Sequence, residues 1–217
     1  MPSEAYMNFN GYLITDVDRL IQAHAVLSPP GHGRRALGHI TRSAVTTLCA
    51  AWEVFLEELL LDVVAIFVNA AGLPSELPDN LKRALIKHIN KKDQHDFKPL
   101  DLAGEGWRGI LREMAQKHVD NFHTPRTRRA VDMFKEVLGV EDVSVFWSRD
   151  VAEVDGFVDA RCEIAHRGAA APYIRINDIH WYRQLIVQTA RDTDRGVAEW
   201  VRDHGPHSRL PWVRRYE

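Results

Sequence analysis

Residues 161–168 read RCEIAHRG and place an arginine and a histidine, Arg161 and His166, five positions apart. An arginine can hold a carboxylate or a phosphate through its fork of N–H donors, and a histidine can exchange a proton near neutral pH. The spacing alone is weak evidence, because a 217-residue chain with twenty-one arginines and eleven histidines is expected to hold roughly one Arg-x4-His pair by chance. Pairs at this spacing include Arg19/His24, Arg34/His39, Arg161/His166, Arg175/His180 and Arg202/His207. The surroundings of each pair must therefore decide which one carries chemistry.

The surroundings favour the pair at Arg161 and His166. A helix is expected over about 149–166, and an apolar arc that also contains Arg161 is formed on it by Val151, Val154, Val158 and Ala165. A guanidinium cannot lose its charge, so on this face it needs a carboxylate, a carbonyl cluster, a subunit interface or a bound phosphate. His166 lies about 140° away around the helix, in the last turn, where the helix dipole favours a protonated imidazole. The other four of these pairs are interpreted as background. Three of them span a helix end or a Gly-Pro break in a helix, and in the fourth Arg19 lies beside two carboxylates.

Apolar residues recur at helical spacing along most of the chain, and no bounded run alternates cleanly between apolar and polar types. The fold class is therefore expected to be all-α, a single-domain bundle of about seven helices over residues 1–217. Proline and glycine breaks and the capping residues Asp79, Thr124 and Asn177-Asp178 indicate the helix ends. The expected helices cover about 10–27, 35–71, 80–91, 106–122, 125–138, 149–166 and 177–203. The second is apolar nearly all round in its second half and should be the central buried helix.

Composition and charge limit the classes of protein that fit. The chain is 45% hydrophobic and 27% charged, with a formal net charge of −2, so any contact with nucleic acid must come from local basic patches. Cys49 and Cys162 have no partner at metal-ligand spacing, which indicates free thiols in a reducing compartment. The most apolar run, 56–73, contains too many charged residues for a membrane span, and the first residues lack a signal-peptide pattern. We expect a soluble, cytoplasmic protein without contact to a membrane.

Two segments together resemble a known family. RCEIAHRG, preceded by the amphipathic VDGFVDA, resembles the terminal helix of HEPN-domain proteins, whose ribonuclease members carry Arg-x4–6-His. TTLCAAWEVFLEELLLDVV at 46–64 resembles the early helix of the RiboL-PSP-HEPN group, in which a small-Trp-Glu step lies inside a long apolar helix. The order of the two segments also fits, so the resemblance covers roughly residues 10–200.

The resemblance implies an endoribonuclease that needs neither metal nor cofactor and acts in prokaryotic stress response or phage defence. His166 would act as general base on the ribose 2′-hydroxyl or as general acid on the leaving 5′-oxygen, and Arg161 would hold the scissile phosphate. The products would be a 2′,3′-cyclic phosphate and a 5′-hydroxyl, so DNA should not be cut. The resemblance also implies a homodimer in which two Arg/His sets share one cleft, with an antitoxin or regulatory protein as a further partner.

Other interpretations of the same residues stay open. HEPN ribonucleases often carry a polar residue, commonly Asn, directly after the arginine, whereas this chain has Cys162, a weak hydrogen-bond donor. The domain could then be a catalytically inactive module that binds RNA, a nucleotide or a protein. Alternatively, Arg161 pairs with an interior carboxylate such as Glu53 and His166 only caps the helix, as in a purely structural dimerisation bundle. Glu53 could also orient Arg161, while Trp52 is expected to serve packing.

Further basic residues are candidates for contacts with the RNA backbone. Arg167 would extend the positive rim of the cleft or only interact with the helix end. Arg126, Arg128 and Arg129 in TPRTRR lie at an expected helix start, where amides and arginines together suit phosphate, although a solvated turn explains them as well. KHINKK at 87–92 is interpreted as a solvated helix face. His88 and His95 lack a defined ligand geometry, so no metal site is expected.

Overall fold

The computed structural model describes residues 1–28, 37–90, 102–205, 208–213 and 216. Within these ranges the chain contains helices and no strands, which confirms the all-α prediction. Counting the continuous helical stretch from Glu4 to Leu27 as one, the described ranges contain seven main α-helices, as expected. Their bounds are α1 Glu4–Asn8, α2 Ile14–Leu27, α3 Gly38–Ala70, α4 Asp79–Ile89, α5 Gly106–Asp120, α6 Thr127–Val137, α7 Val151–Arg167 and α8 Ile176–His204.

The first helical stretch begins earlier than the expected residue 10. Ser3 is the N-cap of α1, and its hydroxyl accepts a hydrogen bond from the amide of Tyr6 at 3.0 Å. A π-helical segment, Phe9–Leu13, joins α1 to α2 without a break. The apolar periodicity of the sequence does not reveal this start, because Ser3 donates to Asp194, which is 191 positions away. The predicted end holds, since α2 stops at Leu27 before the SPPGHG segment, which begins at Ser28 and otherwise lies outside the described residues.

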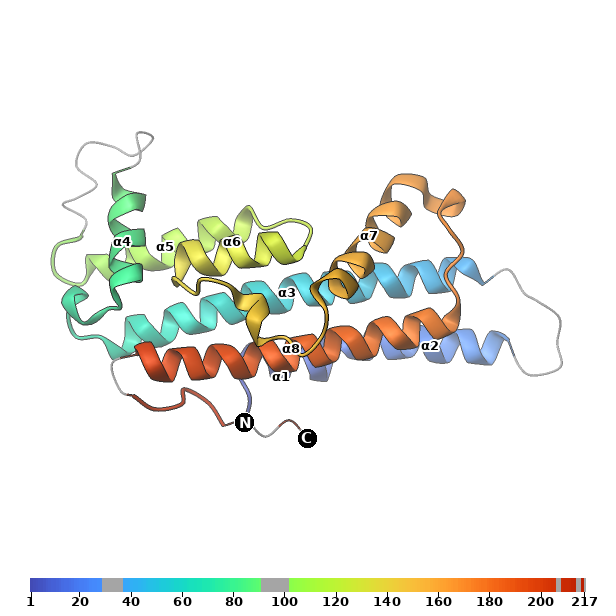
Figure 1. The fold of residues 1–217 in the computed structure, drawn as a ribbon, viewed down its shortest axis with the longest axis horizontal. Coiled ribbons are helices and arrows are strands. Elements are labelled where there is room, and N and C mark those ends of the chain that lie inside the picture. Colours follow the sequence, from blue (N-terminus) through green and yellow to red (C-terminus); the bar gives the residue numbers. More distant parts are fainter. Residues whose placement is uncertain (29–36, 91–101, 206–207, 214–215, 217) are drawn as a thin grey trace.

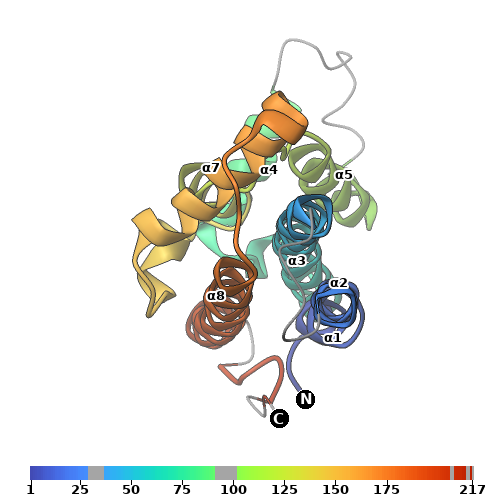
Figure 2. The ribbon, with the colours of Figure 1, turned by 90° about the vertical axis from the view of Figure 1, so that its right-hand side faces the viewer.

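The long helix α3 forms the centre of the molecule, as predicted. The large side chains of its apolar stripe are fully buried, including Trp52, Phe55 and Phe67. Figures 1 and 2 show α2, α3 and α8 as long rods lying side by side, while α4 to α7 cover one side of this layer. Burial of a Leu or Phe side chain contributes about 1.5–3 kcal/mol, so this helix supplies much of the stability of the fold.

Two predicted caps are wrong in detail. Helix α6 begins at Thr127 rather than 125, and Thr124 has a φ of 64°, so it does not cap the helix. Instead the carboxylate of Asp155, on α7, accepts hydrogen bonds from the amide and hydroxyl of Thr127 at 2.8 and 2.9 Å. At α4 the N-cap is Pro78, and Asp79 lies in the first turn, where it pairs with Lys82 at 2.9 Å. A carboxylate from a distant helix cannot be recognised from local sequence.

The predicted helix carrying Arg161 and His166 is confirmed. Asp150 caps α7 by accepting a hydrogen bond from the Ala152 amide at 2.8 Å. The helix ends at Gly168, which has a φ of 53°, a conformation that favours glycine. Helix α8 starts at Ile176, one residue before the expected start, and its Asp178 carboxylate accepts from the amide of Arg175 at 2.8 Å. Asn177 lies inside the first turn of α8 and does not cap it.

Candidate functional site

Arg161 lies on the side of α7 that packs against α3. Its neighbours on this side, Val154, Phe157 and Val158, are fully buried, whereas Arg161 is half-buried. Its guanidinium acts electrostatically on Cys49, a buried thiol of α3. Burial raises the pKa of the Cys49 thiol to about 12, and the charge of Arg161 acts in the opposite direction. Arg161 therefore places a positive charge at the edge of the α3–α7 contact, as its position in the apolar arc predicts.

Arg161 makes no ion pair or hydrogen bond with any described residue, and Glu53 is not its partner. Glu53, half-buried on α3, lies close enough to influence Cys49 but not within ion-pair distance of the guanidinium. The alternative in which Arg161 is neutralised by Glu53 is therefore not what the structure shows. A half-buried guanidinium without a carboxylate can accept an anion from outside the described chain.

His166 is exposed in the last turn of α7 and, within the described ranges, has no hydrogen-bond partner. It points about 140° away from Arg161 around the helix axis, so the two side chains do not meet within one copy. It shares a stripe of α7 with Asp155, Asp159 and Cys162, because these residues follow at intervals of four, three and four positions. Cys162 is half-buried and packs against the core. One chain thus presents the two candidate catalytic side chains on different sides of one helix end.

The other basic candidates lie at the start of α6 or in the last turn of α7, and they differ in how they are bound. Arg126 pairs with Asp159 of α7, so its guanidinium is already engaged. Arg167 pairs with Glu163 at 3.0 Å on the exposed side of the last turns. Arg128 is 93% exposed in its side chain and only 3.9 Å from Asp132. The fourth, Arg129, is exposed and borders a shallow cleft of about 250 Å³. Contacts of these four arginines with RNA stay a prediction.

Glu57 is a titratable residue that the sequence reasoning missed. Burial, followed by the nearby carboxylates of Glu53, Glu58 and Asp120, raises its pKa to about 7. Glu53 and Glu57 are four residues apart on α3 and therefore share one face, which places like charges side by side. That spacing inside an otherwise apolar helix is the signal that could have identified this residue from the sequence.

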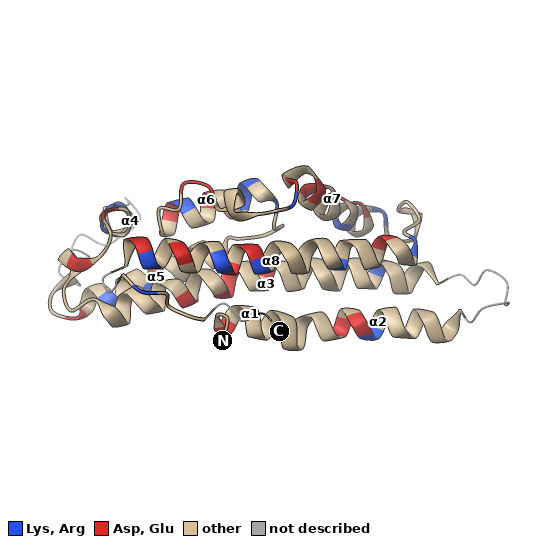
Figure 3. Cartoon of the chain, turned by 60° about the horizontal axis from the view of Figure 1, so that its bottom comes forward, with Lys and Arg blue, Asp and Glu red and all other residues tan. Residues whose placement is uncertain are grey.

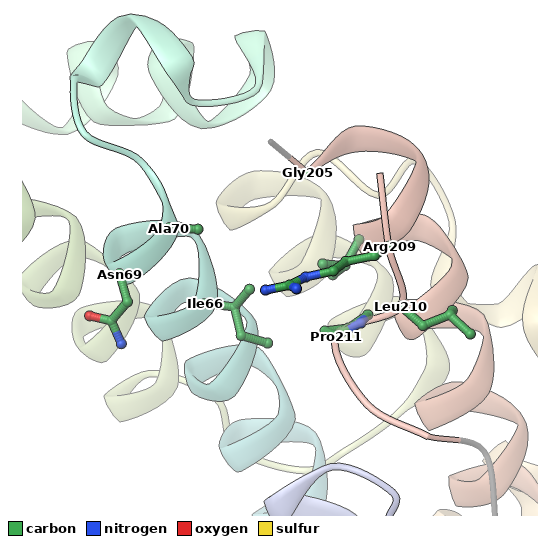
Figure 4. A pocket seen from close by; sticks show the side chains of 8 residues that line it. Ile66, Asn69, Ala70, Gly205, Arg209, Leu210 and Pro211 are labelled. Carbon is green, nitrogen blue, oxygen red and sulfur yellow. The ribbon is translucent and has the colours of Figure 1, made fainter. Parts of the chain in front are cut away.

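The larger described cavities lie away from Arg161 and His166. One of about 480 Å³ lies between the ends of α3 and α8, and Figure 4 shows the Arg209 side chain reaching across it towards Ile66. Another of about 490 Å³ lies between α4 and α6. Among the residues that are described, no three or more His, Cys, Asp or Glu side chains gather as a possible metal site, and His95 lies outside them. In the same ranges no helix is long and apolar enough to cross a bilayer.

Comparison with known families decides the classification of the chain. A family model described as RiboL-PSP-HEPN matches residues 13–199, which is most of the chain. The chain belongs to the RiboL-PSP-HEPN family. No curated protein and no solved structure matches the chain. The resemblance based on residues 46–64 and 161–168 is thereby confirmed at the level of the family.

Membership of the RiboL-PSP-HEPN family is consistent with a nuclease or RNA-binding role. The matched region includes α2, α3, α7 and nearly all of α8. The Trp of the small-Trp-Glu step has a structural role in this member of the family. The Trp52 indole is fully buried and donates to the carbonyl of Pro125 at 3.3 Å, which fixes the segment before α6 against α3. Packing was the expected role of Trp52, and the structure confirms it.

Proposed function

We propose that the protein is a metal-independent endoribonuclease that uses Arg161 and His166. The observation that carries the proposal is the half-buried Arg161 guanidinium, which has no anionic partner in the described chain and lies on the same helix end as the exposed His166. An unneutralised guanidinium at the edge of a core needs an anion, and a phosphodiester supplies one with the matching geometry. Membership of a HEPN family supports RNA as the source of that phosphodiester.

The reaction follows from the chemistry of the two side chains. An imidazole of His166 takes the proton of a ribose 2′-hydroxyl, and the 2′-oxygen attacks the adjacent phosphorus. The bond from phosphorus to the 5′-oxygen breaks, and that oxygen receives a proton from a protonated imidazole. Arg161 binds the non-bridging oxygens and stabilises their growing negative charge. The products are a 2′,3′-cyclic phosphate and a 5′-hydroxyl, and DNA is not a substrate because it lacks the 2′-hydroxyl.

A homodimer supplies what one copy lacks. His166 and Arg161 point about 140° apart on α7, so one chain does not direct both at the same phosphate. Two copies that meet along the last turns of α7 would bring Arg161 of one chain and His166 of the other to one phosphodiester. The second histidine would then serve as the general acid. The exposed last turns of α7 leave this face available.

The proposed setting is the cytoplasm, where the RNA substrates are found and where free thiols such as those of Cys49 and Cys162 persist. A nuclease acting there would be restrained by an antitoxin or regulatory protein and would serve in a toxin–antitoxin or phage-defence system.

The second candidate function is an inactive module that binds RNA, a nucleotide or a protein through the same surface. The observation that favours it is Cys162, which follows Arg161 directly and packs against the core rather than presenting a strong hydrogen-bond donor. In this case Arg161 would hold a phosphate without any cleavage.

Cleavage of a mixed RNA pool in EDTA tests the proposal. The wild type, His166→Ala and Arg161→Lys are compared, and the product ends are identified. Matched controls are His180→Ala, another exposed histidine, and Arg112→Lys, the same exchange at an exposed arginine of α5. We expect cyclic-phosphate ends from the wild type and both controls, and a loss of about a hundredfold or more in the two site variants.

The possible outcomes separate the two candidates. Products that persist in His166→Ala and Arg161→Lys would show that other residues carry the reaction or that a contaminating nuclease is present. A folded, dimeric wild type that binds RNA through Arg161 without cutting it would establish the binding module instead.

A further inference from the structure

A groove of about 250 Å³ on the outer face of α8 is lined almost entirely by hydrogen-bond donors. Its lining consists of Arg149, Arg183, Gln184, Val187, Gln188 and Arg191. Three guanidinium groups and the Gln184 amide form a surface that suits phosphate oxygens, whereas the Gln188 amide already donates to Asp192 at 2.9 Å. The groove is separate from Arg161 and His166, and neither residue lines it.

The position of Arg149 is fixed by its neighbours, although the residue itself is exposed. The Trp147 indole donates to the hydroxyl of Thr193 at 2.9 Å, and the Ser148 amide donates to Asp192 at 2.9 Å. Both acceptors belong to α8, so Trp147 and Ser148 hold the segment before α7 against this helix. Arg149 follows directly and is thereby kept beside the groove.

The positive charge in the groove is only partly balanced. Arg183 donates two hydrogen bonds to Asp18 of α2, at 2.6 and 2.8 Å, so its charge is neutralised. Arg149 and Arg191, in contrast, have no ion pair with a described residue. The guanidinium of Arg191 lies 5.7 Å from the centre of the Tyr216 ring, and its buried Nε–H has no acceptor in the described structure. Figure 3 shows the basic and acidic segments that alternate along α8.

An exposed aromatic side chain extends the groove by one turn. Trp181, Gln184 and Gln188 follow one another at intervals of three and four residues and therefore share one face of α8. Trp181 is 42% exposed, and its ring centre lies 5.3 Å from that of Tyr182. An indole held next to donors for phosphate provides a plane on which an unpaired base can stack.

The direction from Arg149 to Trp181 along α8 is also the direction in which α7 runs towards Arg161. Ser148, before α7, contacts Asp192, whereas Phe157, two turns into α7, contacts Tyr182 with ring centres 5.1 Å apart. The two helices are therefore antiparallel along this contact, and Arg161 lies beyond Tyr182 in the same direction. Arg149 lies just before α7, and Arg161 lies ten residues after the first residue of that helix, which is about 15 Å of helix axis.

We propose that this groove binds the backbone of single-stranded RNA, with phosphates on Arg149 and Arg191 and an unpaired base on Trp181, and directs the strand towards Arg161 and His166. This inference rests on the proposed function and specifies its substrate class, a strand of several unpaired nucleotides. Donors and an aromatic plane in this arrangement match a flexible, polyanionic strand with accessible base faces.

Binding is measured by fluorescence anisotropy of a labelled single-stranded RNA of about 12 nucleotides, with every variant built on His166→Ala to prevent cleavage. Arg149→Gln/Arg191→Gln is compared with Arg83→Gln/Arg112→Gln, which removes the same charge from exposed arginines of α4 and α5. Arg149→Gln alone and Trp181→Ala avoid any disturbance of the partly buried Arg191. We expect about tenfold weaker binding for the groove pair, with a salt slope reduced by about 1.4, and about five- to a hundredfold weaker binding for Trp181→Ala.

Cleavage separates this inference from the proposed function. A dinucleotide has one phosphodiester and cannot bind the groove and the site at Arg161 and His166 at once. Groove variants that retain His166 should therefore cleave a dinucleotide as fast as the wild type, whereas they should cleave longer RNA more slowly. Two results would overturn the groove alone. One is that the groove variants cleave long RNA as fast as the wild type does. The other is that Arg83→Gln/Arg112→Gln weakens RNA binding as much as the groove pair does. Groove-dependent binding without any cleavage would overturn only the catalytic proposal, and a wild type that binds no RNA would overturn both.

Discussion

The two halves of α7 differ in what their charged side chains contact. In the first half, Asp155 and Asp159 both bind the start of α6, through the Thr127 amide and the Arg126 side chain. In the second half, Arg161 and His166 contact no described hydrogen-bonding or charged partner. Asp155 and Asp159 of the first half thus stabilise the fold, and the candidate catalytic groups of the second half are left for a ligand. The contacts of the first half with α6 hold α7 in place and thereby position Arg161 and His166.

The largest expected effect comes from removing the charge of the second half. Arg161→Leu should lower RNA cleavage by about a hundred- to a thousandfold, because the scissile phosphate loses its donor. The free energy of unfolding should stay constant or rise, because a half-buried, unpaired charge is replaced by an apolar side chain. Urea unfolding and cleavage rates measured on the same protein check both statements. A clear loss of stability would mean that Arg161 has an internal partner, and the two halves would not differ as described.

The opposite pattern is expected in the first half. Asp155→Ala removes the acceptor of the Thr127 amide and hydroxyl and should lower the free energy of unfolding by about 1–2 kcal/mol. Glu163→Ala serves as control, because Glu163 lies in the second half and, among the described residues, pairs only with the exposed Arg167. It should change the free energy of unfolding by less than about 0.5 kcal/mol. Equal losses for the two variants in urea unfolding would contradict the comparison.

Local pattern was sufficient to predict the helices but not the contacts between them. The stripe through Trp52 and Phe67 predicted the buried α3, and the apolar arc of α7 correctly placed Arg161 next to the core. The cap of α6 was assigned to Thr124 because Thr-Pro is a frequent helix start, whereas the acceptor is Asp155, on another helix. Side chains that act across 28 positions leave no periodic signal.

The same limit applies to the candidate site. Arg161 and His166 were found because they lie close in one motif. The spacing of Glu53 and Glu57 is also a local signal, but the raised pKa of Glu57 depends first on burial, which the sequence pattern does not give for a charged residue. The groove on α8 was also missed, because Arg149 and Arg191 are far apart in the chain and meet only through the contacts of Trp147 and Ser148.

Glu57 allows the electrostatics between α3 and the end of α5 to be measured. Its pKa is raised from 4.5 to about 7 in the folded protein, so the folded state binds this proton more tightly than the unfolded chain. Its contribution to stability is therefore highest below pH 4.5 and is lost as the pH rises towards 7. Glu57→Gln should raise the free energy of unfolding by about 1 kcal/mol at pH 8, after allowance for solvent screening, and by much less at pH 5.

Urea unfolding of wild type and Glu57→Gln at several pH values measures this window. Glu53→Gln should move the window to lower pH, because the neighbouring charge that raises the pKa of Glu57 is removed. A gain for Glu57→Gln that is independent of pH would assign the effect to packing instead.

The smallest expected effect concerns the ion pair between Arg126 and Asp159. Both side chains are largely exposed, at 42% and 57%, so a double-mutant cycle should give a coupling of about 0.2–1 kcal/mol. The coupling should shrink at 1 M salt, where charges are screened within about 3 Å. A larger, salt-independent coupling would show that this pair holds the first half of α7 as firmly as Asp155 does.

The buried carboxylate of Asp194 accepts hydrogen bonds from Ser3, near one end of the chain, and from Tyr216, near the other, the latter at 2.7 Å. Ser3 and Tyr216 therefore lie close together, and Figure 1 shows the N-terminus on the opposite side of the long helices from α7. Ends that are already bridged need little further loop-closure entropy to be joined. The molecule is therefore suited to circular permutation: a short linker between the present ends, with new ends opened near Pro74–Glu76, would keep α7 and α8 in one uninterrupted segment.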